Sequence, residues 1–150
     1  MYLEKTLLIL YYSLIYPHLI YGIEVWGSAN ISLIKRLLTL QKRALFINLN
    51  ILKIHDIFKI NISLFVYQCL HKLCLPQFYS WFPQTSQIHN YHTRSAADKN
   101  LYIPRVRTTY YGLKSIKFMG PKIWNDLPFS IKTIELYNSF QDKWKYHFMT

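Results

Sequence analysis

Apolar residues recur along the first half of the chain with the period of an α-helix. Residues 2–16 are apolar on most sides, which predicts a central, buried helix. Residues 31–47 place most of their apolar side chains on one face, and Asn30 before them suits the N-cap position. Residues 56–73 predict a third helix, which Pro76 ends because proline cannot continue it. We therefore expect the first half of the chain to be helical.

The second half of the chain carries shorter and more polar patterns. Residues 83–103 are rich in polar side chains and predict a long exposed loop. Residues 104–119 alternate basic and apolar side chains around Gly112, which predicts a short β-hairpin. Residues 138–148 repeat aromatic side chains at four-residue intervals and predict a last helix. The predicted fold class is mainly α, a small domain of about four to five helices with this hairpin.

The stretch FMGPKIWNDLPFS near the C-terminus contains two prolines that would bound one short helix. Pro121 suits the first helical position, where the missing N–H would have had no partner. Pro128 ends the helix because the residue before a proline is pushed out of the helical region. Trp124 then lies on the apolar face of this helix and is predicted to be a structural anchor. We predict the same role for Trp26 and Trp144.

The composition is that of a folded and strongly basic chain. Its 150 residues are 51% hydrophobic and 17% aromatic, which argues against disorder. Eighteen Lys and Arg against seven Asp and Glu give a formal net charge of +11. Such an excess favours a polyanionic partner, either nucleic acid or an anionic membrane surface. The charge is uneven, because Lys5 is the only Lys or Arg among residues 1–34.

Residues 7–23, LLILYYSLIYPHLIYGI, raise the alternative of a membrane segment. They are nearly free of charge and have about the length of a membrane span, and a signal peptide would have a similar core. Pro17 and His18 in the middle of the run, and Glu24 after it, would be costly in lipid. We therefore favour a buried helix that is kinked or ended at Tyr16, without stable membrane insertion.

Cys69 and Cys74 are too few for a disulfide framework. Five residues apart on a helix, they would point about 140° away from each other. His71, His89 and His92 are close in sequence, but there is no second Cys pair to give a zinc-ligand spacing. We expect reduced, structural cysteines in an intracellular protein, and no metal.

Five short motifs then follow one another along the chain: IYPHLIYGIEVWG, LQKRA, HNYHTR, GPKIWNDLP and SFQDKWK. In this order they resemble the C-terminal end of the reverse transcriptases of non-LTR retrotransposons, in particular the jockey-like, LINE-type group. That family carries, after its catalytic palm, runs close to Y-x-H-L-x-Y-G-x-x-x-W-G, L-Q-K-R-A, T-R and G-P-x-x-W-N-x-L-P, and a final helix opened by S-F. The resemblance extends from about Tyr11 to Lys145. Each motif alone is weak, and it is their common order that makes the resemblance.

The chain departs from the family pattern in two places. The family usually has another arginine shortly after L-Q-K-R-A, where this chain has Leu45, Phe46 and Ile47. The connection to the next helix, NLNILKIHD, is also shorter than in the family. Both departures concern the helix predicted at residues 31–47, where we expect Lys35, Arg36, Lys42 and Arg43 to form a basic face that points away from the apolar one.

The resemblance implies one domain with three parts: a helical thumb-like region at 1–82, an exposed polar loop at 83–103, and the hairpin with C-terminal helices at 104–150. Nucleotidyl transfer needs neighbouring carboxylates that hold two metal ions about 4 Å apart. The seven acidic residues form no neighbouring pair, and there is no Y-x-D-D-like turn. We therefore expect a fragment of an RNA-directed DNA polymerase that has no catalysis and no cofactor of its own. Magnesium would be bound by the palm of the parent enzyme.

In the parent enzyme this region would help to hold the template–primer nucleic acid. The resemblance thus implies a nucleic-acid partner, an RNA–DNA or DNA duplex bound without sequence specificity, and the palm region as a second partner, in the nucleus or cytoplasm. For the cations of residues 31–47, an ordinary solvated face is an equal alternative. The candidate phosphate-binding residues are Lys35, Arg36, Lys42, Arg43, Arg94, Arg105, Arg107, Lys114 and Lys117.

Two other classes of protein stay open at this stage. One is a small cationic, membrane-associated helical protein anchored by residues 7–23. The other is a non-functional relic that keeps only a structural fold.

Overall fold

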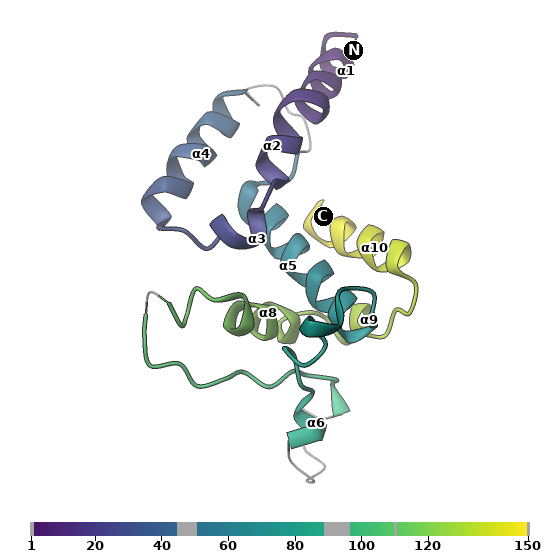
Figure 1. Ribbon diagram of the computed structural model, residues 1–150. Coiled ribbons are helices and arrows are strands. Elements are labelled where there is room, and N and C mark those ends of the chain that lie inside the picture. The colour runs from purple at the N-terminus through teal and green to yellow at the C-terminus, as the bar shows by residue number, and fades with distance from the viewer. Residues whose placement is uncertain (1, 45–50, 89–96, 110, 150) are drawn as a thin grey trace. The chain divides into compact units, whose positions relative to one another are not determined.

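The computed structural model describes residues 2–44, 51–88, 97–109 and 111–149, and it is mainly helical (Figure 1). The predicted mainly α class is therefore confirmed. The helices are more numerous than the four to five predicted, because several single-turn helices lie between the longer ones. The chain divides into two compact units, Met1–Phe58 and Lys59–Phe148. The domain boundaries drawn from the sequence stay predictions.

The apolar N-terminal run forms one interrupted helix: α1 (Tyr2–Leu10), the π-helical turn η1 (Tyr11–Ile15) and α2 (Tyr16–Ile20). In the π turn, the Tyr16 N–H donates to the Tyr11 carbonyl, five residues earlier. Pro17 gives a physical reason for this wider turn. It has no N–H, and in a regular α-helix its ring would collide with the carbonyl of Ser13. The helix is thus widened before Pro17 and continues beyond it.

The surface of this N-terminal helix differs from the prediction of a buried helix. Tyr11 is 4% exposed, whereas Ile9 is 67% and Leu14 61% exposed. The prediction was wrong because hydrophobicity on most sides of a helix shows only that it can be buried. Burial also requires a covering surface. Among the described residues, no helix combines the length and the apolarity that crossing a membrane requires.

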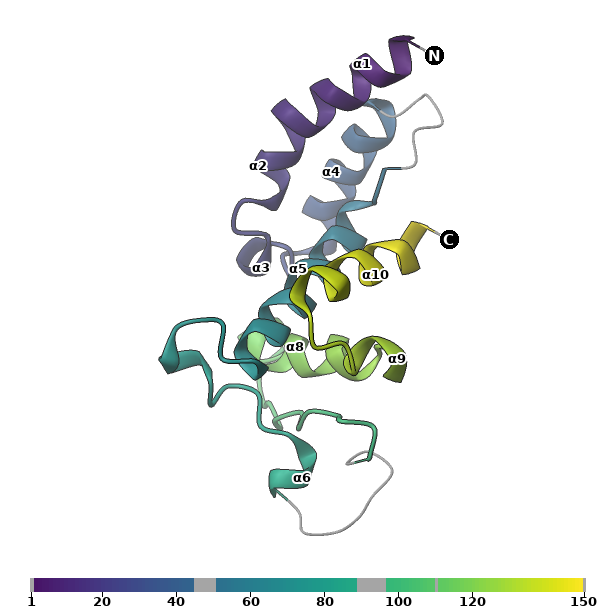
Figure 2. The same cartoon turned by 90° about the vertical axis from the view of Figure 1, so that its right-hand side faces the viewer.

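The first unit continues with α3 (Ile23–Trp26) and α4 (Ile31–Ala44). The helix predicted from residue 31 is confirmed, and the Asn30 Oδ1 accepts a hydrogen bond from the Ser32 N–H at 3.4 Å, as an N-cap should. The predicted end of this helix lies outside the described residues. In both views α4 lies beside α1 and α2 (Figures 1 and 2), and Ile34 on its apolar face is buried.

Helix α5 (Ile54–Leu70) begins in the first unit and ends in the second. It ends three residues before the predicted end, because Lys72 takes a left-handed backbone conformation with φ of 56°. The Leu73 N–H then donates to the Gln68 carbonyl at 2.8 Å, which closes the helix end. The short 3-10 helix η2 (Pro76–Phe78) follows.

The polar segment at 83–103 is described at both of its ends. It contains α6 (Thr85–Ile88), and Gln84 forms an isolated antiparallel bridge with Leu101. The Thr85 Oγ1–H donates to the Asn100 carbonyl at 2.8 Å. The two ends of the segment are therefore tied together, and Leu101 is buried.

The predicted β-hairpin at 104–119 is wrong. In the described part of this stretch there is no strand. The N–H groups of Gly112 and Leu113 both donate to the Thr108 carbonyl, at 3.1 and 3.2 Å, so the chain closes a turn on itself and forms no ladder. Helix α8 (Ile116–Asn125) then occupies the place of the predicted second strand.

The glycine–proline pair of the GPKIWNDLP motif lies inside α8, so the predicted helix start at Pro121 is also wrong. The structure gives Gly120 another role. A Cβ there would lie 2.8 Å from Phe82 Cε1 and 3.0 Å from Val66 Cγ2. Gly120 therefore allows α8 to approach α5 and Phe82 closely.

The second unit is completed by α9 (Phe129–Lys132) and α10 (Tyr137–Met149), the latter beginning one residue before the predicted start. Phe140 of α10 is fully buried. Its ring stacks on Tyr67 at 4.6 Å and on Trp124 at 5.9 Å between centroids. This aromatic cluster connects α5, α8 and α10 and forms the centre of the unit.

Candidate nucleic-acid interface

Three of the predicted phosphate-binding residues lie on α4. The side chains of Lys35, Arg36 and Lys42 are exposed, whereas Ile34 and Gln41 are buried. The predicted separation of a basic face from an apolar face is therefore confirmed for these residues. The side chain of Arg43, and Arg94 as a whole, lie outside the described residues.

The LQKRA motif also contains a buried amide, Gln41, to which the sequence reasoning gave no role. Its Nε2–H groups donate to the Leu52 carbonyl at 2.8 Å and to the Tyr11 hydroxyl at 3.2 Å. Its Oε1 accepts from the Ile54 N–H at 3.2 Å. Burial raises the pKa of Tyr11, and the hydrogen bond from Gln41 opposes that effect. Gln41 therefore has a structural role. The feature of the sequence that could have indicated this role is that Gln41 is a lone amide on an otherwise apolar helix face.

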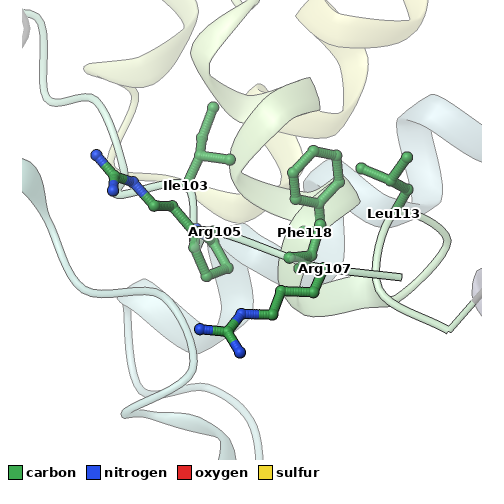
Figure 3. Close-up of a pocket in the computed structure, with 7 residues that line it drawn as sticks. Ile103, Arg105, Arg107, Leu113 and Phe118 are labelled. Atoms are coloured by element: carbon green, nitrogen blue, oxygen red, sulfur yellow. The ribbon is translucent and has the colours of Figure 1, made fainter. Parts of the chain in front are cut away.

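The second unit holds a pocket of about 770 Å³ beside two predicted phosphate-binding residues (Figure 3). Arg105 and Arg107 are exposed, and their guanidinium groups point away from Leu113 (Figure 3). The predicted alternation of basic and apolar side chains is present, but in an irregular extended segment and not in a strand. The pocket is lined by Ile103, Pro104, Arg105, Val106, Arg107, Leu113 and Phe118.

Lys114 and Lys117 are not among the residues that line this pocket. Lys117 is exposed, and its Nζ lies 4.5 Å from the centre of the Trp81 ring, a cation–π contact. Lys114 is half-buried. The structure therefore brings Arg105 and Arg107 to one pocket and leaves the two lysines outside it.

The WN pair of the GPKIWNDLP motif holds the segment that leads into this pocket. The Trp124 Nε1–H donates to the Lys99 carbonyl at 3.3 Å. The Asn125 Nδ2–H donates to the Leu101 carbonyl at 2.9 Å, and its Oδ1 accepts from the Leu101 N–H at 2.8 Å. Trp124 is buried, so the geometry fits its predicted role as an anchor. Both residues fix the backbone a few positions before Arg105.

Lys132 is a buried cation that the sequence reasoning missed. Its side chain is 6% exposed, and its Nζ donates to Asn100 Oδ1 at 2.8 Å and to the Asn125 carbonyl at 3.0 Å. Burial lowers the pKa of Lys132, and the charges of Asp98 and Asp126 oppose that effect. No local pattern marked this lysine, since its partners come from other parts of the chain. It is a structural cation and is not available to a phosphate.

The other two predicted anchors differ in burial. Trp144 is 5% exposed and its ring stacks on His147 at 5.4 Å between centroids. Trp26 is half-buried, and its Nε1–H donates to the Tyr21 carbonyl at 2.8 Å. Each tryptophan therefore makes contacts inside its own unit.

In the part of the chain that the structure describes, no three His, Cys, Asp or Glu side chains gather where they could hold a metal ion. No protein-family model matches the chain, and neither does a curated protein or a solved structure. The assignment to a reverse transcriptase thus stays a hypothesis that rests on the order of the five motifs.

Proposed function

We propose that this chain is the C-terminal, thumb and post-thumb region of a LINE-type reverse transcriptase, and that it helps to hold the template–primer duplex. The order of the five motifs supports the family. The binding role rests on one observation: two exposed guanidinium groups, of Arg105 and Arg107, lie at one pocket, a few residues after the backbone that Trp124 and Asn125 hold at Lys99 and Leu101.

The chemistry of these side chains suits a duplex of any sequence. A guanidinium presents five N–H donors in a planar fork that matches phosphate oxygens. Phosphate contacts position a duplex without reading its bases, which a polymerase requires because it must hold every sequence. A fixed backbone helps, since less conformational freedom is then lost on binding. The exposed cations of α4 would extend the same kind of contact in the first unit.

The salt dependence of binding tests this proposal. Affinity for a short RNA–DNA hybrid would be measured by fluorescence anisotropy at several salt concentrations. If about six cations neutralise phosphates, the slope of log affinity against log salt should be near –5, and affinity should fall roughly a thousandfold between about 50 and 200 mM salt. Hybrids of unrelated sequence should behave alike. A flat slope would reject the phosphate-holding role.

A charge-matched pair of variants tests the placement at the pocket. Changing Arg105 and Arg107 together to Ala should flatten the slope by about two units. The control changes Lys122 and Lys143 to Ala, which removes the same charge from two other exposed positions. The control should leave the slope within about one unit of the wild-type value. Equal effects of the two double variants would show that only total charge matters and would reject the pocket as the site.

A second candidate function is favoured by the exposed apolar side chains of Ile9, Leu10 and Leu14. In the parent enzyme the palm region would cover such a surface. Without it, residues 7–23 could anchor a small cationic protein at the surface of a membrane. Co-sedimentation with anionic lipid vesicles distinguishes the membrane-associated function from the nucleic-acid-binding function. Binding to vesicles without binding to the hybrid would select the membrane-associated function.

A further inference from the structure

Cys69 and Cys74 lie side by side at the end of α5. Their Sγ atoms are 3.3 Å apart, and both thiols are free. The expectation that they point about 140° apart was wrong, because it assumed a helix that continues through both residues. The helix ends at Leu70, and the chain turns back before it reaches Cys74.

Backbone geometry brings the two thiols together. Lys72 has φ of 56°, the Lys72 N–H donates to the Cys69 carbonyl at 3.3 Å, and the Leu73 N–H donates to the Gln68 carbonyl at 2.8 Å. These two bonds and the left-handed residue define a Schellman motif. The Tyr79 hydroxyl holds the turn from outside by donating to the Lys72 carbonyl at 3.1 Å.

We propose that Cys69 and Cys74 are an oxidation-responsive site that forms a reversible intramolecular disulfide. The two thiols differ in access. Cys69 is 2% exposed, whereas Cys74 is half-buried and can meet a small oxidant such as hydrogen peroxide. Cys74 is therefore the attacking residue and Cys69 the resolving residue.

Burial supports this division of roles. It raises the pKa of the Cys69 thiol to about 12, with a further contribution from Cys74. The Cys69 thiol thus keeps its proton at neutral pH, and a protonated thiol is a poor nucleophile toward peroxide. Cys69 can react only once an electrophilic sulfur stands beside it.

The reaction has two steps that balance. The Cys74 thiolate attacks one oxygen of hydrogen peroxide, the O–O bond breaks, and the departing hydroxide takes up the proton that Cys74 released, which gives a sulfenic acid and one water. The Cys69 sulfur then attacks the sulfur of Cys74. The S–S bond forms, the S–O bond breaks, and the hydroxyl leaves as a second water with the Cys69 proton. The two thiols lose two electrons and the peroxide gains them.

Intact mass and thiol labelling of the full chain test this proposal. After treatment with peroxide, the native chain should lose two hydrogens in mass, and no thiol should react with a maleimide after denaturation. A thiol reductant should restore both thiols. The disulfide closes a small loop, which should raise the unfolding temperature by about 5 °C. Disulfide-linked dimers, or separate oxidation of both cysteines beyond the sulfenic acid, would overturn the proposal.

Two groups of variants test whether the disulfide forms because of this turn geometry or only because the two cysteines are close in sequence. Cys69→Ser should leave Cys74 to gain oxygen without forming a disulfide, whereas Cys74→Ser should react slowly because the remaining thiol is buried. Lys72→Gly suits a positive φ and should keep the rate of disulfide formation. Lys72→Val disfavours that φ and should slow the reaction about tenfold, with helix content checked by circular dichroism. An equal rate in Lys72→Gly and Lys72→Val would show that the turn does not bring the thiols together.

Discussion

The side-chain amide of Asn125 hydrogen-bonds both backbone groups of Leu101, donating to its carbonyl at 2.9 Å and accepting from its N–H at 2.8 Å. Leu101 is buried, so its backbone groups need partners within the protein. The amide thus pairs with the backbone groups of Leu101 that its bridge with Gln84 leaves open. It couples the end of α8 to the chain that leads to Arg105 and Arg107.

Removal of this amide should destabilise the second unit. Asn125→Ala leaves the Leu101 N–H and carbonyl without these two bonds, which should lower the free energy of unfolding by about 2 kcal/mol. Asn125→Asp keeps the acceptor and loses the donor, so its effect should also be destabilising. Urea denaturation followed by tryptophan fluorescence would measure both. A change in Asn125→Ala no larger than that of the exposed-site control Lys122→Ala would contradict the assigned role.

Gly120→Ala should destabilise the chain although alanine is the better helix former. Alanine would gain about 1 kcal/mol in helix propensity. Its Cβ, however, would lie 2.8 Å from Phe82 Cε1 and 3.0 Å from Val66 Cγ2. Such overpacking costs roughly 1–3 kcal/mol, so the net effect should be unfavourable. Lys122→Ala, at an exposed position of the same helix, should change stability by less than about 0.5 kcal/mol. A more stable Gly120→Ala variant would show that α8 and α5 are not packed this closely.

His71 should titrate below its ordinary value of 6.5. Its ring stacks on Tyr67 at 4.1 Å between centroids, and burial lowers the pKa of His71, while Glu135 raises it and Lys99 lowers it. Between the folded-state pKa and 6.5, the unfolded state binds more protons. The contribution of His71 should therefore make stability rise with pH across this window. NMR titration of the imidazole carbon-bound protons would measure the pKa.

A control for this titration is Glu135→Gln, which should lower the pKa of His71 further because it removes the charge that raises it. A rise of the pKa in this variant would show that the two side chains do not interact as described.

The exposed apolar side chains of α1 and η1 should cause self-association of the purified chain. Ile9 and Leu14 are 67% and 61% exposed, and surfaces of this kind favour association. The double change of Ile9 and Leu14 to Gln should reduce the apparent mass in light scattering at high concentration. The matched control changes Val25 and Leu136, which are 81% and 71% exposed, to Gln as well. This control should reduce the apparent mass less than the change of Ile9 and Leu14. A wild-type chain that stays monomeric at high concentration would contradict this prediction.

The sequence predicted the features that depend on local periodicity. The helices that contain Ile34, Tyr67 and Phe140 were found because a helical repeat is visible within one segment. The prediction failed at 104–119 because an irregular segment can alternate exposed and half-buried side chains just as a strand does. The sequence could suggest the candidate cations, but it could not show which of them share a pocket, since that depends on the path of the chain.

The remaining errors concern contacts between distant residues. The role of Gly120 depends on Val66 and Phe82, and the burial of Lys132 depends on Asn100. The left-handed conformation of Lys72 was not predictable from residue type, because such positions favour glycine.

Because the ammonium group of Lys132 is buried, the lysines of the folded chain should differ in their reactivity toward reagents that acylate amines. Its Nζ is shared between Asn100 and Asn125, whereas Lys122 and Lys143 are exposed. Acylation of the two exposed lysines should be fast and should leave the fold intact. Acylation of Lys132, or tryptic cleavage after it, requires the second unit to open first. This lysine is therefore a natural reporter of how often that unit opens.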